Sequence, residues 1–228
     1  APTSGAPGDS NQILRELVKY DWTRQVLVPV VSPEIVTQAS QVGSGDEITV
    51  EVGGMRDPFS TPLPLTVKVE RLFDGQFTIS GHLAKNLAID MGRCAVVSHR
   101  GISIIVTSRS GPHFAPEFFL RAGFDPFAEG LLIAKSPCGF RAAYQSRATL
   151  IRIANVTGCA RSDFWNLPYQ TIPRPLWPWD REMLHIIDFE GEIYMRQEGK
   201  GMLMGTYERA GKPWAEHSTP WNFTSELL

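Results

Sequence analysis

The chain has little cysteine and no long apolar run. Its 228 residues include only Cys94, Cys138 and Cys159, and no two of them form a CxxC pair. An odd number of widely spaced cysteines argues against a disulfide framework and is typical of proteins in a reducing compartment. No apolar stretch approaches the ~18 residues that a membrane-spanning helix needs. We therefore expect a soluble, cytoplasmic protein that makes no contact with a membrane.

The chain also lacks an excess of positive charge and the histidine spacings of metal sites. Lys and Arg total 22 against 24 Asp and Glu, which gives a formal net charge of -2. Small molecules or peptides are therefore expected as partners, and nucleic acid is not. The five histidines include no HxH or HExxH spacing. We expect them to be surface or locally bonded residues, and we expect no metal ion in this chain.

Neither end of the sequence reads as the end of a complete protein. The chain begins at Ala1 without an initiator Met or a signal-like apolar run, and it stops at Leu228 soon after the strand-like residues 219–223. We therefore expect a fragment at both ends. A change of character near Asp180 divides it further into a first domain, residues 1–180, and a second piece, residues 181–228.

The first domain alternates helical and strand periods, which predicts a mixed α/β (α+β) fold with one mixed sheet. Apolar spacing predicts helices over residues 10–20, 33–42, 116–120 and 140–146, and strands over 26–31, 47–52, 65–73, 131–134 and 150–154. Asp74-Gly75 has the composition of a two-residue hairpin turn, and a second hairpin is expected at residues 99–101. The proline-rich residues 158–180 are typical of an extended tail.

Polar clusters lie where the predicted strands and helices meet. Gly8 and Asp9 belong to a glycine-containing loop, residues 5–10, that runs into the first helix. The unpaired N–H groups of that helix could hold a carboxylate or phosphate, or Asp9 could simply cap the helix. Arg109 follows one predicted strand and Lys135 another. Because ligands of α/β sheets sit at the carboxyl ends of strands, these clusters are candidate sites, although each is also compatible with a solvated turn.

These clusters occur in the order found in the C-terminal domain of the microcystinase C (MlrC) family of zinc metallopeptidases, which residues 1–180 resemble. The segments that carry the resemblance are residues 5–10, 106–109, 135–136 with 140–142, and 167–169 with 174–178. The family's loop motif resembles Asp-Asn-Pro-Gly-Gly-Gly-x-x-Gly-Asp, and its last Asp matches Asp9. The resemblance implies that Asp9 is a catalytic residue. The residues that it implies bind substrate are Gly8, Arg109, Lys135, Ser136 and Arg141.

The same resemblance implies that an N-terminal domain, absent from this sequence, supplies the ligands of a catalytic zinc. This chain would then complete an active site for peptide or amide substrates and would be inactive alone. Gly139 stands where many members of the family have a His, so the role of this position is open. We expect Asp9, Arg109 and Lys135 to converge on one face, where a cation could hold a substrate carboxylate or stabilise an oxyanion.

Residues 181–228 resemble a piece of a different family, the FAD-dependent dimethylglycine and sarcosine dehydrogenases. The likeness rests on residues 186–208, 212–214 and 219–221, and it includes a predicted hairpin around residues 199–201. This sequence has no GxGxxG loop, so FAD would bind only the parent of this piece. Tyr194, Arg196 and Tyr207 are candidate substrate-side residues there, or simply cross-strand packing residues.

The C-terminal piece is expected to be a loosely attached hairpin, because a two-stranded hairpin alone is marginal in water. Its apolar residues would then be exposed: Ile186, Ile187, Ile193, Met202, Leu203 and Met204. Three functions remain open for the whole chain: an MlrC-like zinc-hydrolase domain with a foreign tail, a flavin amine oxidoreductase, and a non-catalytic binding module. We favour the first because its motifs span most of the chain, whereas a flavoenzyme would need a cofactor fold ahead of residue 181.

Overall fold

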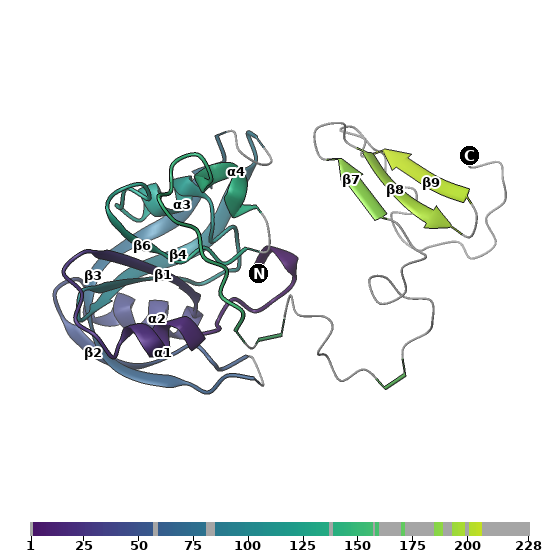
Figure 1. The fold of residues 1–228 in the computed structure, drawn as a ribbon. Helices are drawn as coiled ribbons and strands as arrows, with labels where there is room; N and C mark the ends of the chain where they lie inside the picture. Colours follow the sequence, from purple (N-terminus) through teal and green to yellow (C-terminus); the bar gives the residue numbers. More distant parts are fainter. Residues whose placement is uncertain are drawn as a thin grey trace, which may run out of the picture. The chain divides into compact units, whose positions relative to one another are not determined.

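The computed structural model describes residues 2–56, 59–80, 85–136, 139–156, 158–159, 170–171, 185–188, 193–198 and 201–206 (Figure 1). The chain divides into two compact units, Ala1–Phe164 and Trp165–Leu228. The first unit contains a six-stranded mixed sheet, and the second contains a three-stranded antiparallel sheet. The expected mixed α/β class is confirmed.

The six-stranded sheet has a parallel half and an antiparallel half. Its strand order is β2-β3-β4-β5-β1-β6, with the bounds Glu47–Val52, Leu63–Thr78, Ala88–His99, Ile102–Thr107, Gln25–Val31 and Gly130–Leu132. β1 pairs in parallel with β5 and with β6, whereas the other neighbours are antiparallel. The carboxyl ends of the three adjacent strands β5, β1 and β6 therefore lie at one edge of the sheet.

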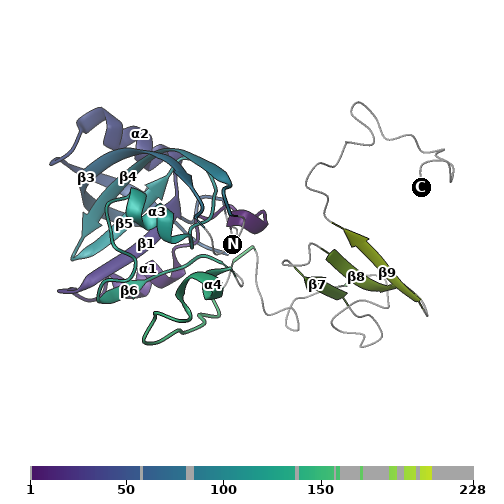
Figure 2. The same cartoon turned by 90° about the horizontal axis from the view of Figure 1, so that it is seen from above.

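Helices cover both faces of this sheet (Figures 1 and 2). The described helices of the first unit are η1 (Pro2–Ser4), α1 (Gln12–Leu17), α2 (Pro33–Val42), α3 (Pro116–Arg121) and α4 (Phe140–Tyr144). α1 and α2 share a core with Val28 and Ile104. α3 packs with Leu27 and Ile105 on the opposite face. Successive side chains of a strand point to opposite faces of the sheet, and here helices cover both faces. For this reason β1 and β5 consist of continuous apolar runs.

Local signals explain two elements that the sequence predicts correctly. Ser32 caps α2, since its side chain accepts a hydrogen bond from the Ile35 amide, and Pro33 begins the helix at a position that needs no amide donor. The hairpin of β4 and β5 turns at Arg100 and Gly101, which have φ of 48° and 78°. Positive φ at both central residues is the geometry of a tight hairpin turn.

The expected turn at Asp74-Gly75 is wrong. β3 continues through these residues to Thr78, and its ladder with β4 shifts register between Asp74 and Gln76, as at a β-bulge. The Asp74 carboxylate is bound by Arg121 of α3 and also accepts a hydrogen bond from the amide of Gln76 at 3.3 Å, within the bulge. The chain therefore reverses later, between β3 and β4, and the two strands form a much longer ribbon than the Asp-Gly signal implies.

A second expectation, a strand over residues 150–154, is also wrong. These residues are described and have no regular secondary structure. Leu150 and Ile153 are exposed. An apolar run of this length gains strand structure only by pairing with a neighbouring strand, and β6 instead ends the described part of the sheet on this side.

The second unit has one strand more than the expected hairpin. β8 (Ile193–Glu198) and β9 (Gly201–Thr206) match the two predicted strands, and β7 (His185–Asp188) pairs with β8 on its other side. Tyr194 lies opposite Gly205, where a Cβ would come 2.3 Å from its ring, so its ring packs across the strands. Leu203 and Met204 are exposed as expected. The side chains of Ile186, Ile187, Ile193, Met202 and Arg196, and all of Tyr207, lie outside the described residues.

Candidate functional site

The candidate site lies at the carboxyl ends of β5, β1 and β6, where ligands of α/β sheets commonly bind. The loop of residues 5–10 crosses the end of β1, because the amide of Val31 donates to the carbonyl of Gly8 at 3.2 Å. β5 ends beside β1, since the next amide, that of Ser32, donates to the carbonyl of Thr107 at 2.9 Å. Segments far apart in the sequence are thus brought together here.

Gly8 permits the loop to lie this close to β1. Its φ is +79°, a left-handed conformation that L side chains rarely adopt, and an added Cβ would come 2.6 Å from Cγ2 of Val31. The sequence predicts Gly8 to be a substrate-binding residue. The structure gives it a local reason to be glycine that needs no ligand.

Asp9 is buried, with 1% of its surface exposed. Its Oδ2 accepts a hydrogen bond from the amide of Arg56 at 2.7 Å. Its carbonyl accepts one from the amide of Gly54 at 2.9 Å. A Cβ on Gly53 would lie 2.0 Å from that carbonyl oxygen, so the turn after β2 needs glycine there as well. The loop around Asp9 is therefore packed directly against residues 53–56.

Asp9 does not cap the first helix, so that alternative is wrong. The N-cap residue of α1 is Asn11, and no side chain makes a capping hydrogen bond there. The other carboxylate oxygen of Asp9, Oδ1, is buried and has no hydrogen-bond partner among the described residues. A buried polar atom left unpaired costs ~1–3 kcal/mol. Asp9 thus has a hydrogen-bonding capacity that the described fold leaves unused.

Lys135 reaches the same loop from the segment after β6. Its Nζ donates to the carbonyl of Gly8 at 3.0 Å and to the carbonyl of Ser10 at 2.8 Å. Burial lowers the pKa of Lys135 to about 8, and the nearby Asp9 carboxylate opposes this shift. The neighbouring Ser136 Oγ is buried and also lacks a partner among the described residues. The structure therefore places the predicted residues Asp9, Lys135 and Ser136 in one region.

His113, which the sequence patterns do not single out, lies fully buried beside this cluster. Its Nε2 is 3.1 Å from Oγ1 of Thr107, and that hydroxyl donates to the carbonyl of Arg109 at 2.9 Å. Because the hydroxyl has only one proton to give, the ring must donate through Nε2. Burial, and then the Lys135 ammonium, lower the pKa of His113 to about 3. Its Nδ1 is a buried acceptor with no partner in the described part of the chain.

His113 is therefore not a surface histidine, and only one of its two ring nitrogens, Nε2, is locally bonded. A signal in the sequence could have found it. The Gly-Pro-His-Phe run at residues 111–114 lies in the loop that follows the buried strand β5, at the edge where the other polar clusters lie. The loop after a parallel strand is a common position for functional residues.

The two predicted arginines have other partners. The guanidinium of Arg109 pairs with the Asp90 carboxylate at 2.6 Å, beside the start of β4. Arg141 is exposed, and its guanidinium carbon lies 5.3 Å from the ring centroid of Phe140. Gly139 occupies the N-cap position of α4. Of the three residues expected to converge, the structure joins Asp9 with Lys135 and directs the Arg109 side chain to Asp90.

The described residues offer no group of three or more His, Cys, Asp and Glu side chains that could hold a metal ion. Within the same residues, Cys94 is buried, and burial raises the pKa of its thiol to about 12. None of the described helices has the length and apolar character needed to cross a bilayer.

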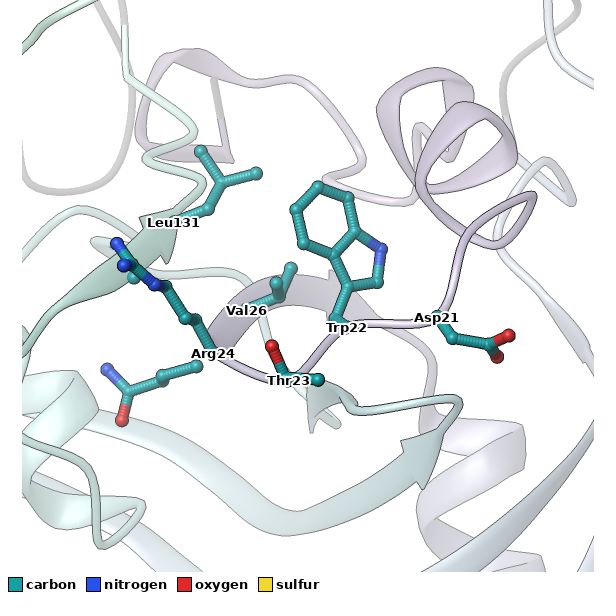
Figure 3. Close-up of a pocket in the computed structure, with 8 residues that line it drawn as sticks. Asp21, Trp22, Thr23, Arg24, Val26 and Leu131 are labelled. Atoms are coloured by element: carbon teal, nitrogen blue, oxygen red, sulfur yellow. The ribbon is translucent and has the colours of Figure 1, made fainter.

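A pocket of about 320 Å³ lies at the opposite, amino ends of β1 and β6 (Figure 3). Trp22, Arg24 and Leu131 are among the residues that line it. The indole Nε1 of Trp22 already donates to the carbonyl of Leu17 at 2.9 Å. The pocket contains none of the buried unpaired atoms that distinguish the carboxyl ends of the strands, so we place the candidate site at Asp9.

Comparison with known proteins gives three matches. Residues 1–171 match the family model described as the MlrC C-terminus. Microcystinase C of a Sphingomonas species is 25% identical over 183 residues, which cover 78% of this chain and 34% of that protein. The solved structure of a candidate metallopeptidase from Mesorhizobium sp. BNC1 is 24% identical with a TM-score of 0.68, covering 87% of this chain and 37% of the other. The chain thus spans about a third of the length of its curated relative, and the structural likeness bears on the fold alone.

Proposed function

The chain belongs to the MlrC C-terminus family, and on that premise we propose that it supplies one part of the active site of an MlrC-like zinc metallopeptidase. Its substrates would be peptides or related amides. The remaining part of the site, with the zinc ligands, would come from an N-terminal domain such as the longer relatives have room for. Alone, this chain would be inactive.

The observation that carries this proposal is the buried Asp9 carboxylate with Oδ1 unpaired. An ionised carboxylate can only accept hydrogen bonds. The donor that it lacks would therefore be a water or an N–H group, held where a general base or an orienting group is needed for hydrolysis. Oδ1 is enclosed in the described fold, so this proposal requires that the loop of residues 5–10 opens when the missing domain or a substrate packs against it and supplies that donor.

The described residues do not fit a zinc ion, since they contain no suitable group of ligands. Under this proposal its ligands belong to residues other than the described ones. Arg109 and Arg141 are also less suited to hold a substrate carboxylate than the sequence suggests, because Arg109 is paired with Asp90 and Arg141 is exposed.

The test is a hybrid enzyme in which residues 1–171 of this chain replace the matching third of microcystinase C. Hydrolysis of a linear peptide is measured for the hybrid and for its Asp9→Asn variant. We expect kcat to fall at least ~100-fold, the usual effect of losing a general acid or base. The matched control is Asp21→Asn, because the Asp21 side chain is exposed and lies 3.8 Å from Arg100 far from this cluster. It should leave kcat unchanged.

Folding and zinc content of the hybrid make the result decisive. A folded, zinc-loaded hybrid that does not hydrolyse peptides would contradict the proposal. So would an Asp9→Asn variant that hydrolyses at the unsubstituted rate. Circular dichroism and metal analysis of each variant separate these outcomes from simple misfolding.

A further inference from the structure

Lys135 contacts the chain on both sides of Asp9. Its ammonium donates to the carbonyls of Gly8 and Ser10, at 3.0 and 2.8 Å, across more than a hundred residues of sequence. The ammonium has three N–H donors in all. Two of them bind the backbone of the loop that carries Asp9, so only one donor remains that could bind a substrate.

The loop needs such an anchor. Gly5 and Gly8 both have positive φ, at 81° and 79°, and glycine gives the unfolded backbone more freedom than other residues do. The carbonyl of Gly8 is also bound by the amide of Val31, but Ser10 has no other donor to its carbonyl among the described residues. Removing the Lys135 ammonium would therefore leave the carbonyl directly after Asp9 without a donor among the described residues, although the next residue, Asn11, stays bonded to Val52 and Thr61.

We propose that Lys135 is a positioning residue, which holds the carbonyls before and after Asp9 and thereby fixes the direction of the Asp9 carboxylate. It would not bind a substrate carboxylate. The catalytic meaning of this role rests on the proposed function, but the role itself is a property of this chain alone. The half-buried position of Lys135 near the Asp9 carboxylate agrees with it, because a charge partly withdrawn from water persists where opposite charge and hydrogen bonds compensate it.

Three backbone amides report the position of the loop. The amides of Val31, Gly54 and Arg56 donate to the Gly8 carbonyl, the Asp9 carbonyl and Asp9 Oδ2, respectively. Two other amides serve as controls. Ser32 lies next to Val31 but donates to Thr107, and Gly45 donates to Val69 at the start of the β2–β3 ladder. Hydrogen exchange at these five amides, followed by NMR in the full 228-residue chain, tests the proposal without any substrate.

Lys135→Met keeps an unbranched side chain, one heavy atom shorter than that of lysine, and removes its donors. We expect exchange at Val31, Gly54 and Arg56 to rise about tenfold or more, while Ser32 and Gly45 change less than twofold. Lys135→Arg, which keeps donors and charge, should restore most of the protection. Unchanged exchange at the three reporters would overturn the proposal. An equal rise at all five amides would do so too, because it would mean general destabilisation.

The hybrid enzyme adds a readout that separates positioning from substrate binding. A positioning role predicts that Lys135→Met lowers kcat with little change in KM, and that Lys135→Arg recovers part of the loss. A raised KM with unchanged kcat would instead make Lys135 a substrate-binding residue. If the hybrid hydrolyses nothing, the proposed function fails, while hydrogen exchange still decides whether Lys135 holds the loop.

Discussion

The two ends of the parallel strands β5, β1 and β6 differ in what they leave unfilled. The amino ends have space: a pocket of about 320 Å³, in which the Trp22 indole is already bonded and Arg24 lies 3.9 Å from Glu129. The carboxyl ends have unused hydrogen-bonding capacity, on Asp9, His113 and Ser136. A hollow shows where a molecule can fit, whereas unpaired buried groups show where the fold itself is incomplete.

This difference has an energetic meaning. Polar groups that stay unpaired inside a protein cost stability, and a stable fold keeps few of them without a reason. A pocket lined by paired or exposed groups costs little. The carboxyl ends should therefore respond strongly to changes in charge and packing, and the exposed side chains of the pocket wall at the amino ends should not.

Acid should disturb the carboxyl ends most. The pKa of His113 is lowered from 6.5 to about 3. Between these values the unfolded chain binds a proton that the folded chain does not, so the free energy of unfolding falls as the pH falls, by up to ~1.4 kcal/mol per pH unit. Urea unfolding at stepped pH from 7 down to about 4 measures this slope. His113→Gln should flatten this slope. An equal slope in both proteins would mean that His113 does not cause the acid sensitivity of the carboxyl ends.

Gly8→Ala should have the next largest effect. The new Cβ would meet Val31 at 2.6 Å and would also force a left-handed conformation on alanine, which together cost about 3 kcal/mol. Gly5→Ala is the matched control, because Gly5 has a similar φ of +81° but nothing within 4 Å of its Cβ position. It should cost only about 1 kcal/mol. Equal losses in thermal unfolding would mean that Val31 moves aside easily.

Raising the pH should change the free energy of unfolding through Lys135. The change should be smaller than the one that acid causes through His113, and it should be an increase. The pKa of Lys135 is lowered from 10.5 to about 8. In that window the folded chain loses its proton first, so the free energy of unfolding rises with pH. The total is smaller than for His113, because the window is narrower and the residue is only half-buried. Unfolding at pH 7.5 and pH 9.5 measures the rise, which should vanish in Lys135→Met and persist in His113→Gln.

Sequence patterns predict the elements of this fold better than they predict its connections. The period of α2 and the turn at Arg100-Gly101 depend on neighbouring residues, so they can be read directly. Asp74-Gly75 has an equally good local signal, but β4 pairs with β3 on both sides of it, and long-range pairing overrides the turn. The strand predicted over residues 150–154 is wrong for the converse reason. The local sequence favours a strand, but no neighbouring strand of the described sheet pairs with it.

The candidate site shows the same limit. Asp9 and Lys135 can each be placed in a polar loop from the sequence, but their meeting depends on β6 lying next to β1. Arg109 could equally have joined them, and only the course of β4 beside it supplies Asp90 as its partner. His113 escapes sequence reasoning because a lone histidine carries no spacing signal. Its burial follows from the packing of α3 against the sheet, where its ring lies 5.2 Å from Phe118.

The smallest effect is expected at the amino ends of the strands. Arg24→Ala removes a cation from the pocket wall, but its side chain is 75% exposed and that of Glu129 is 87% exposed. An exposed ion pair at such a distance is screened by water and contributes at most a few tenths of a kcal/mol. Thermal unfolding should therefore shift by less than about 0.5 kcal/mol, the limit expected for a surface substitution. A loss comparable to that of Gly8→Ala would mean that this pocket is held as tightly as the Asp9 loop, and that the contrast between the two ends is not one of stability.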